Sequence, residues 1–132
     1  MRADRLRPPE VGPDPAFRFP IVIRHSLGNG LDVRTVEHHT VPVVSSVLLV
    51  EGGVGADPHG REGLAAITAD LVDEGTGALS AIEVSEGFAR IGAGYDVDVG
   101  ADATLFSLTT LSRFAARGAS LLADIVVRPS LR

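Results

Sequence analysis

Apolar residues change their spacing along the chain, and each spacing predicts a different kind of element. The first half contains short β-branched runs separated by polar or glycine-containing turns, which predicts strands over residues 19–25, 31–36 and 43–50. From Arg61 the apolar residues recur three and four positions apart, which predicts a helix over about 61–74 that ends at Gly75. A β-rich first half is therefore followed by a helix.

The second half returns to strands and ends in another helix. Ser80 and Glu83 form a capping-box pattern, which predicts a second helix running to about Ile91. Apolar and acidic residues alternate over 95–99, typical of a strand with one solvated face, and 104–110 is its expected antiparallel partner. We expect Ser112 to cap a third helix that Pro129 closes.

The predicted order is β-β-β-α-α-β-β-α, which indicates an α+β domain with an antiparallel or mixed sheet and helices packed on one face. Residues 1–18 are rich in proline, arginine and acidic residues, so we expect an extended N-terminal arm there. The remaining 19–132 are expected to form one α+β domain, because 132 residues are too few for two ordinary domains.

Composition removes several classes of function. The net charge is −5 and no lysine is present, so nucleic acid is not an expected partner. The absence of cysteine excludes disulfides and thiolate chemistry, and no apolar run approaches the roughly 18 residues of a membrane span. The N-terminus lacks the continuous apolar segment of a secretory signal, so a cytoplasmic location is expected.

Several ordered segments of the chain carry a family resemblance. The segments are residues 27–31 between two strands, 40–44 before a long strand, the loop 52–65, residues 73–76, and 122–130 near the end. In these segments the chain resembles the N-terminal domain of the pitrilysin/insulinase family of zinc metallopeptidases, the inverted zincins. That resemblance implies a truncated version of the family's metallopeptidase domain.

Active members of that family carry His-x-x-Glu-His on a helix, where two histidines bind zinc and the glutamate activates a metal-bound water. The resemblance places Ala66 at the first histidine, Ala69 at the glutamate and Asp70 at the second histidine. No zinc cofactor is therefore expected in this chain, although active members use one, and no catalytic or metal-binding residue is assigned.

The resemblance implies a non-catalytic structural or substrate-holding subunit fragment that pairs with an active peptidase subunit. Two alternatives stay open: a zinc metallopeptidase whose ligands come from elsewhere, and a stand-alone peptide-binding module. Asp96 and Asp98, on the wet side of their strand, are the candidate substrate-binding residues, suited to a basic or extended peptide. Exposed strand edges in a partial sheet also favour self-association into a homo-oligomer.

Other motifs have ordinary structural explanations. Gly55 and Gly60 have the spacing of a phosphate-binding loop, but Arg61 and Glu62 stand where lysine and Ser/Thr are required. The carboxylates at 70, 73 and 74 are consistent with a hard-cation site or with a solvated cluster, and the second is favoured. Adjacent histidines at 38 and 39 are expected at the surface.

Overall fold

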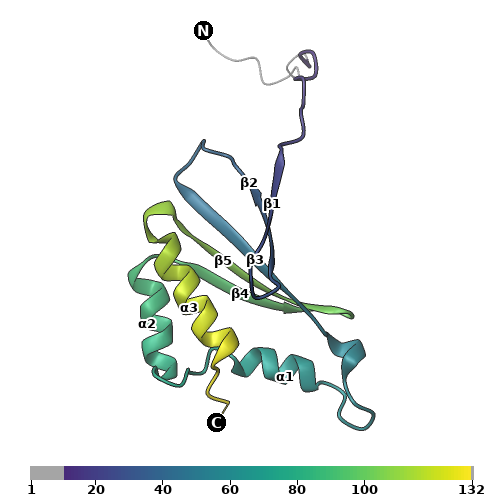
Figure 1. The fold of residues 1–132 in the computed structure, drawn as a ribbon, viewed down its shortest axis with the longest axis vertical. Helices are drawn as coiled ribbons and strands as arrows, with labels where there is room; N and C mark the ends of the chain where they lie inside the picture. Colours follow the sequence, from purple (N-terminus) through teal and green to yellow (C-terminus); the bar gives the residue numbers. More distant parts are fainter. Residues whose placement is uncertain (1–10, 132) are drawn as a thin grey trace, which may run out of the picture. The chain divides into compact units, whose positions relative to one another are not determined.

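The structure, a computed structural model, describes residues 11–131 and divides into two units, 1–39 and 40–132, which are described separately. In the first unit, strands β1 (Val22–Ser26) and β2 (Asp32–Val36) form an antiparallel hairpin (Figure 1). Its turn contains Gly30 at a φ of 88°, a left-handed conformation that glycine adopts without strain. The described part of the predicted arm, residues 11–18, has no regular structure, and residues 1–10 lie outside the described residues.

The second unit contains a three-stranded sheet. Strands β3 (Val43–Glu51), β4 (Gly94–Val99) and β5 (Ala103–Leu111) pair antiparallel in the order β3-β5-β4. Helices α1 (Leu64–Leu71), α2 (Ala81–Arg90) and α3 (Ala115–Val127) lie on one side of it (Figure 1). Single 3-10 turns, η1 (Val54–Ala56) and η2 (Ser112–Phe114), precede α1 and α3. The element order, the α+β class and the helices on one face are confirmed, and every strand pair is antiparallel.

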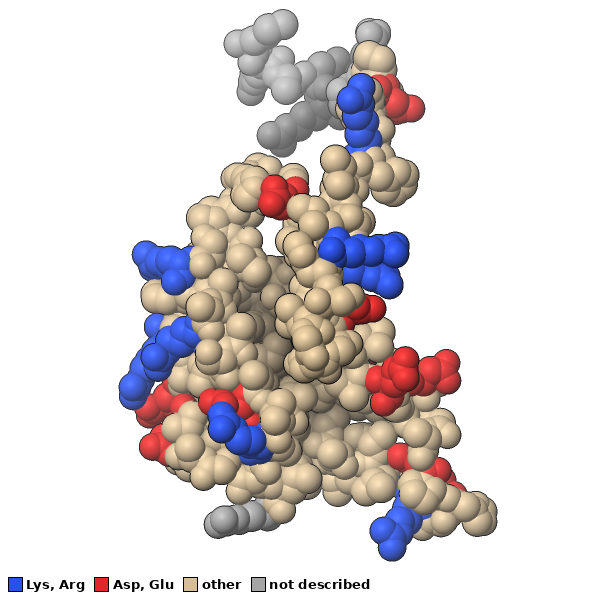
Figure 2. All heavy atoms as spheres, in the orientation of Figure 1, with Lys and Arg blue, Asp and Glu red and all other residues tan. Residues whose placement is uncertain are grey.

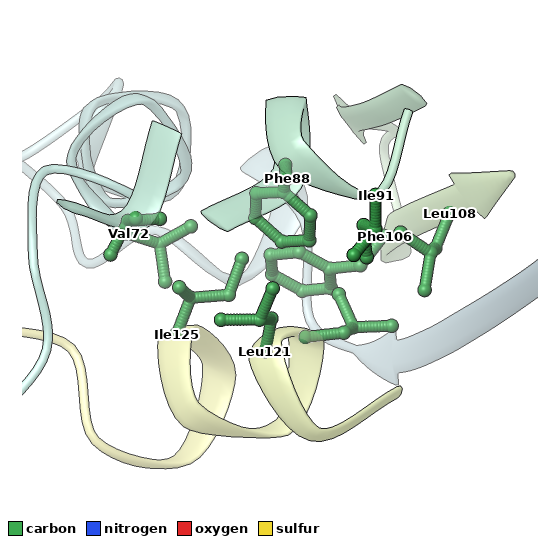
Figure 3. Close-up of a cluster of buried hydrophobic side chains, with 9 residues drawn as sticks. Val72, Phe88, Ile91, Phe106, Leu108, Leu121 and Ile125 are labelled. Atoms are coloured by element: carbon green, nitrogen blue, oxygen red, sulfur yellow. The ribbon is translucent and has the colours of Figure 1, made fainter. Parts of the chain in front are cut away.

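The core lies between this sheet and its helices. Every second residue of β5 turns toward the helices, and Phe106 and Leu108 on that side are 7% and 2% exposed. Figure 3 shows these side chains meeting Phe88 and Ile91 from the α2 region and Ile125 from α3. Among residues 11–131 no helix packs on the opposite face of the sheet, so the buried apolar cluster lies on the helix side.

Gly118 allows α3 to approach β5 closely. A Cβ there would lie 3.1 Å from Leu108 Cδ2 and 3.4 Å from Thr110 Cγ2. A glycine that lowers helix propensity is therefore accommodated because it permits close helix–sheet packing.

Two predicted helix starts are wrong, each for a local reason. The α1 helix begins at Leu64 and not at Arg61, because Gly63 has a φ of 95°, which is outside the helical region. Ser112 caps no helix: it is the first residue of η2, and this 3-10 turn comes before α3, which starts three residues later. The capping box of α2 is confirmed, with Ser80 and Glu83 bonding each other's backbone amides.

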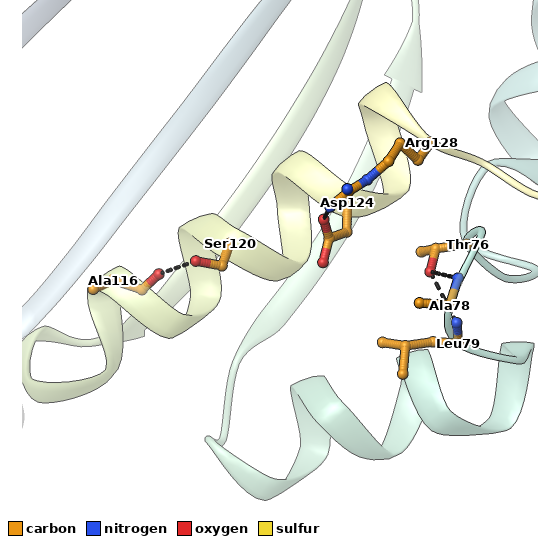
Figure 4. A network of polar contacts seen from close by, with 7 residues as sticks. All are labelled: Thr76, Ala78, Leu79, Ala116, Ser120, Asp124 and Arg128. Atoms are coloured by element: carbon orange, nitrogen blue, oxygen red, sulfur yellow. Dashed lines mark hydrogen bonds and ion pairs between the residues drawn. The ribbon is translucent and has the colours of Figure 1, made fainter.

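The last described residues fold back onto the loop between α1 and α2. The Ser130 amide donates to the Gly75 carbonyl at 2.9 Å, and the Gly77 amide donates to the Arg128 carbonyl at 3.0 Å. Buried Thr76 accepts the amides of residues 78 and 79 on its hydroxyl, as Figure 4 shows. The loop between α1 and α2 is therefore held by residues that follow α3 and by the side chain of its own Thr76.

Candidate functional site at helix α1

Helix α1 and the loop before it form one wall of an apolar cavity of about 320 Å³. Leu64 and Val72 lie on the helix side, and Val50 and Phe106 lie on the sheet side. The rest of the lining comes from small residues and from Asp57, Pro58, Thr68 and Thr104. The cavity thus lies beside the helix that carries Ala66, Ala69 and Asp70, the residues that the family resemblance assigns to the metal motif.

The polar groups of this cavity are engaged in internal hydrogen bonds. Asp57 accepts the amides of Gly63 at 2.7 Å and Ala65 at 2.9 Å, which places its negative charge at the helix N-terminus. The Thr68 hydroxyl donates to the Leu64 carbonyl, and the Thr104 hydroxyl donates to the Gly52 carbonyl. These groups fix the backbone, so the cavity presents an apolar surface.

The three motif positions lie on α1 in different environments. Ala66 is half-buried, Ala69 is 4% exposed, and Asp70 is exposed. Ala69 also lines the cavity. Its methyl group therefore packs where the resemblance places a general base.

Zinc does not fit the residues present. The methyl groups of Ala66 and Ala69 have no donor atom, and one carboxylate at Asp70 falls short of the three protein ligands that a catalytic zinc needs. Within residues 11–131, no three histidine or acidic side chains are grouped where they would hold a metal ion, and this includes the carboxylates at 70, 73 and 74. No reaction step through zinc follows from this chain's own residues.

Tyr95 is a half-buried titratable group on β4. Burial, together with the negative charges of Asp73 and Asp96, raises the pKa of Tyr95 to about 12. Its ring stacks on Phe88 with centroids 5.4 Å apart, and its buried hydroxyl has no hydrogen-bond partner in the described chain. A phenol held neutral in this way is a packing group and not a general base at neutral pH.

Asp96 and Asp98 lie on the face of the sheet opposite the helices, which we name the open face. They are paired across strands with Ser107 and Leu105, which alternate with the helix-facing residues of β5. On the same face of β3, Val47 and Leu49 are 63% and 59% exposed. The open face therefore combines exposed acidic and exposed apolar side chains.

The remaining sequence candidates are separated from one another or bonded locally. Glu62 accepts the Gly60 amide at 3.0 Å, and backbone hydrogen bonds lower the pKa of its carboxyl group, so the glycine loop directs a carboxylate toward its own amides. His59 lies 3.6 Å from Glu62, and His39 lies 3.6 Å from Glu37, all at the surface. The glycine loop that contains Gly60 and Glu62 is therefore unsuited to binding phosphate.

Basic and acidic side chains are intermixed on the face drawn in Figure 2, without a continuous basic surface. Within residues 11–131 no helix has both the length and the apolar character needed to cross a bilayer.

Comparison with solved structures places the fold among peptidases. The chain superposes on a peptidase M16 inactive domain from Pseudomonas fluorescens with a TM-score of 0.78 and 24% identity, over 85% of this chain. It superposes on a protease from Helicobacter pylori with a TM-score of 0.79 and 23% identity, over 86% of this chain. The chain shares their fold.

M16 is the pitrilysin/insulinase family of peptidases, so the resemblance found in the sequence is confirmed at the level of the fold. The chain spans 27% of the length of each of these two structures. No family model and no curated protein matches the sequence.

The sequence did not reveal the cavity itself. Val50 and Phe106 line it from strands that are far apart in the chain, and no local pattern connects them to α1. The capping role of Asp57 had a partial signal, since an acidic residue next to Pro58 before a helix indicates a shaped loop.

Proposed function

We propose that this chain is part of a non-catalytic subunit of a pitrilysin/insulinase-type peptidase, which supports an active subunit and helps to hold its peptide substrate. The observation that carries the proposal is the pair Ala66 and Ala69 on α1, within a fold shared with M16 proteins. The likeness to a domain described as inactive in Pseudomonas fluorescens supports it. The zinc and the general base would then come from the partner subunit.

The packing around α1 favours this proposal over a peptidase that borrows ligands from elsewhere. Borrowed ligands would still need a base beside the metal, and the polar groups of the cavity, Asp57, Thr68 and Thr104, already bond the chain's own backbone. Threonine hydroxyls are not bases at neutral pH, and protonation of Asp57 would weaken its hydrogen bonds to the amides at the start of α1.

The substrate-holding role is assigned to the open face. Asp96 and Asp98 would attract a basic peptide, and Val47 and Leu49 would contact its apolar side chains. The same face would serve the alternative function, a peptide-binding module that works without a peptidase.

The test is reconstitution with the native partner. The tagged chain, purified from its own cells, is expected to retain a second protein that carries an intact His-x-x-Glu-His. Recombinant partner alone and partner plus chain are then compared for cleavage of a basic peptide, and addition of the chain should raise kcat/KM. Zinc bound in stoichiometric amount together with cleavage by the purified chain alone would overturn the proposal.

The open face is tested by D96R/D98R, with E74R/D102R as the control because it makes the same charge change at exposed acids outside that face. D96R/D98R should raise KM for the basic peptide and leave partner binding intact, whereas the control should change neither. Binding of the peptide by the chain without any effect on a partner would instead support the stand-alone module.

A further inference from the structure

The β1–β2 hairpin leaves a large part of its apolar surface exposed. Val22, Ile23 and Val36 are 49%, 38% and 47% exposed, and only Val33 in its strands is half-buried. An isolated two-stranded hairpin is marginally stable in water and gains its stability by packing against something else. The exposed apolar side chains of the hairpin are therefore suited to packing against another surface.

One face of the hairpin carries two arginines directly opposite each other. Arg24 is paired with Arg34 across the strands, so both side chains project from the same face, beside the cross-strand pair Val22 and Val36. Among residues 11–131 neither guanidinium has an acidic partner. Like charges directly opposite each other destabilise a sheet unless a counter-charge lies between them, so this arrangement calls for an acidic surface.

The other unit of the chain supplies a surface of complementary charge. Residues 40–132 contain six arginines and twelve acidic residues, a net charge of −6, whereas residues 1–39 have six arginines and five acidic residues, a net charge of +1. On the open face, Asp96 and Asp98 are two residues apart on β4, and Val47 and Leu49 are exposed on β3. Strand β5 lies between these acidic and apolar residues, so the open face carries its anions on β4 and its exposed apolar side chains two strands away on β3. Two cations beside valines on the hairpin thus face a surface that holds both kinds of partner.

We propose that the Arg24–Arg34 face of the hairpin docks on the open face of a second copy of this chain. Each copy carries both surfaces, so two copies related by a two-fold axis make the contact twice and double the buried area. The hairpin then occupies the face assigned to basic peptides, so self-association and peptide binding compete. The inference rests on the proposed role of the open face but not on a catalytic partner.

The experiment is sedimentation velocity of the full chain in low salt, with charge reversal on each side. Wild type is expected to form dimers, and R24E/R34E and D96R/D98R are each expected to raise the dissociation constant about 100-fold or more. Equimolar mixing of these two variants should restore dimers, because each contact then pairs opposite charges. The controls R61E/R117E and E74R/D102R reverse equal charge at exposed positions outside both faces and should dimerise like wild type.

The docking would be overturned if wild type is monomeric at all concentrations, or if the two variants fail to associate when mixed. A hairpin that folds onto its own chain would give the first of these results. Far-ultraviolet circular dichroism of each variant excludes misfolding as the cause. Binding of a basic peptide to R24E/R34E separates the two proposals: if the variant binds the peptide, the assigned role of the open face stands whatever the oligomeric state.

Discussion

The Asp57 carboxylate accepts the backbone amide of Ala65, eight residues further along the chain, at 2.9 Å, and so joins the loop to the first turn of α1. The same carboxylate accepts the Gly63 amide. One side chain therefore satisfies two helix-terminal donors and fixes the wall of the cavity.

Asp57→Ala should lower the free energy of unfolding by about 1–2 kcal/mol, because it removes the acceptor for two amides at a helix N-terminus. Asp57→Asn keeps one carbonyl acceptor and should cost less. Urea unfolding followed by circular dichroism measures both. Equal losses in the two variants would mean that the charge, and not the number of hydrogen bonds, carries the effect.

Gly53→Ala should be among the most damaging single-methyl changes in the chain. A Cβ at Gly53 would overlap the Gly100 carbonyl oxygen and lie 2.8 Å from that of Ala101, and both are backbone atoms of the β4–β5 turn. We expect a loss of about 1–3 kcal/mol in unfolding free energy. Gly77→Ala is the matched control, because its Cβ would meet no atom within 4 Å, and it should stay within about 0.5 kcal/mol of wild type.

Tyr95 is the only tyrosine, and the chain has no tryptophan, so its ionisation can be followed directly by ultraviolet absorbance. Native protein should titrate near a pKa of about 12 and urea-unfolded protein near the ordinary value of about 10. Because the folded state keeps its proton longer, this stabilising contribution is complete below about pH 10 and is lost as pH rises through about 12. Tyr95→Phe should remove that part of the alkaline loss of stability, and an unchanged alkaline profile would count against the assignment.

Histidines introduced at positions 66 and 70 of α1 test whether side chains at these two positions can bind zinc together. A66H/D70H places imidazoles four residues apart, so zinc should raise the melting temperature of this variant but not that of wild type. D70H alone is the control and should respond weakly. No peptide cleavage is expected, because Ala69 still stands at the position of the base. An absent zinc response would show that the two positions do not converge on a metal.

Much of the fold could be predicted from the sequence, because its signals are local. The alternation over 95–99 sets the two faces of β4, and the Ser80–Glu83 pair fixes the start of α2. The start of α1 could not be read in this way, since it depends on a carboxylate six to eight residues earlier and on the left-handed conformation of Gly63. Ser112 has the residue type of a cap, but it lies inside the 3-10 turn η2, which the sequence pattern did not predict.

For the candidate site, the sequence assigns residues to motif positions but gives no sign of the cavity. Ala66, Ala69 and Asp70 are located by the family resemblance, whereas the cavity beside them joins β3, α1 and β5 through contacts that no sequence period encodes. The separation of the hairpin into its own two-stranded sheet was likewise invisible, because apolar strands 22–26, 32–36 and 43–51 read alike whether they share a sheet or not.

The hydrogen bonds between residues 128–130 and residues 75–77 link the C-terminal end of α3 to the loop between α1 and α2. In terms of hydrogen exchange, these segments should behave as one cooperative opening unit, since releasing one removes the partner of the other. The amides of Gly77 and Ser130 would then exchange at similar rates, although they are 53 positions apart in the sequence. A single opening event would therefore expose both the loop and the end of α3 to proteases.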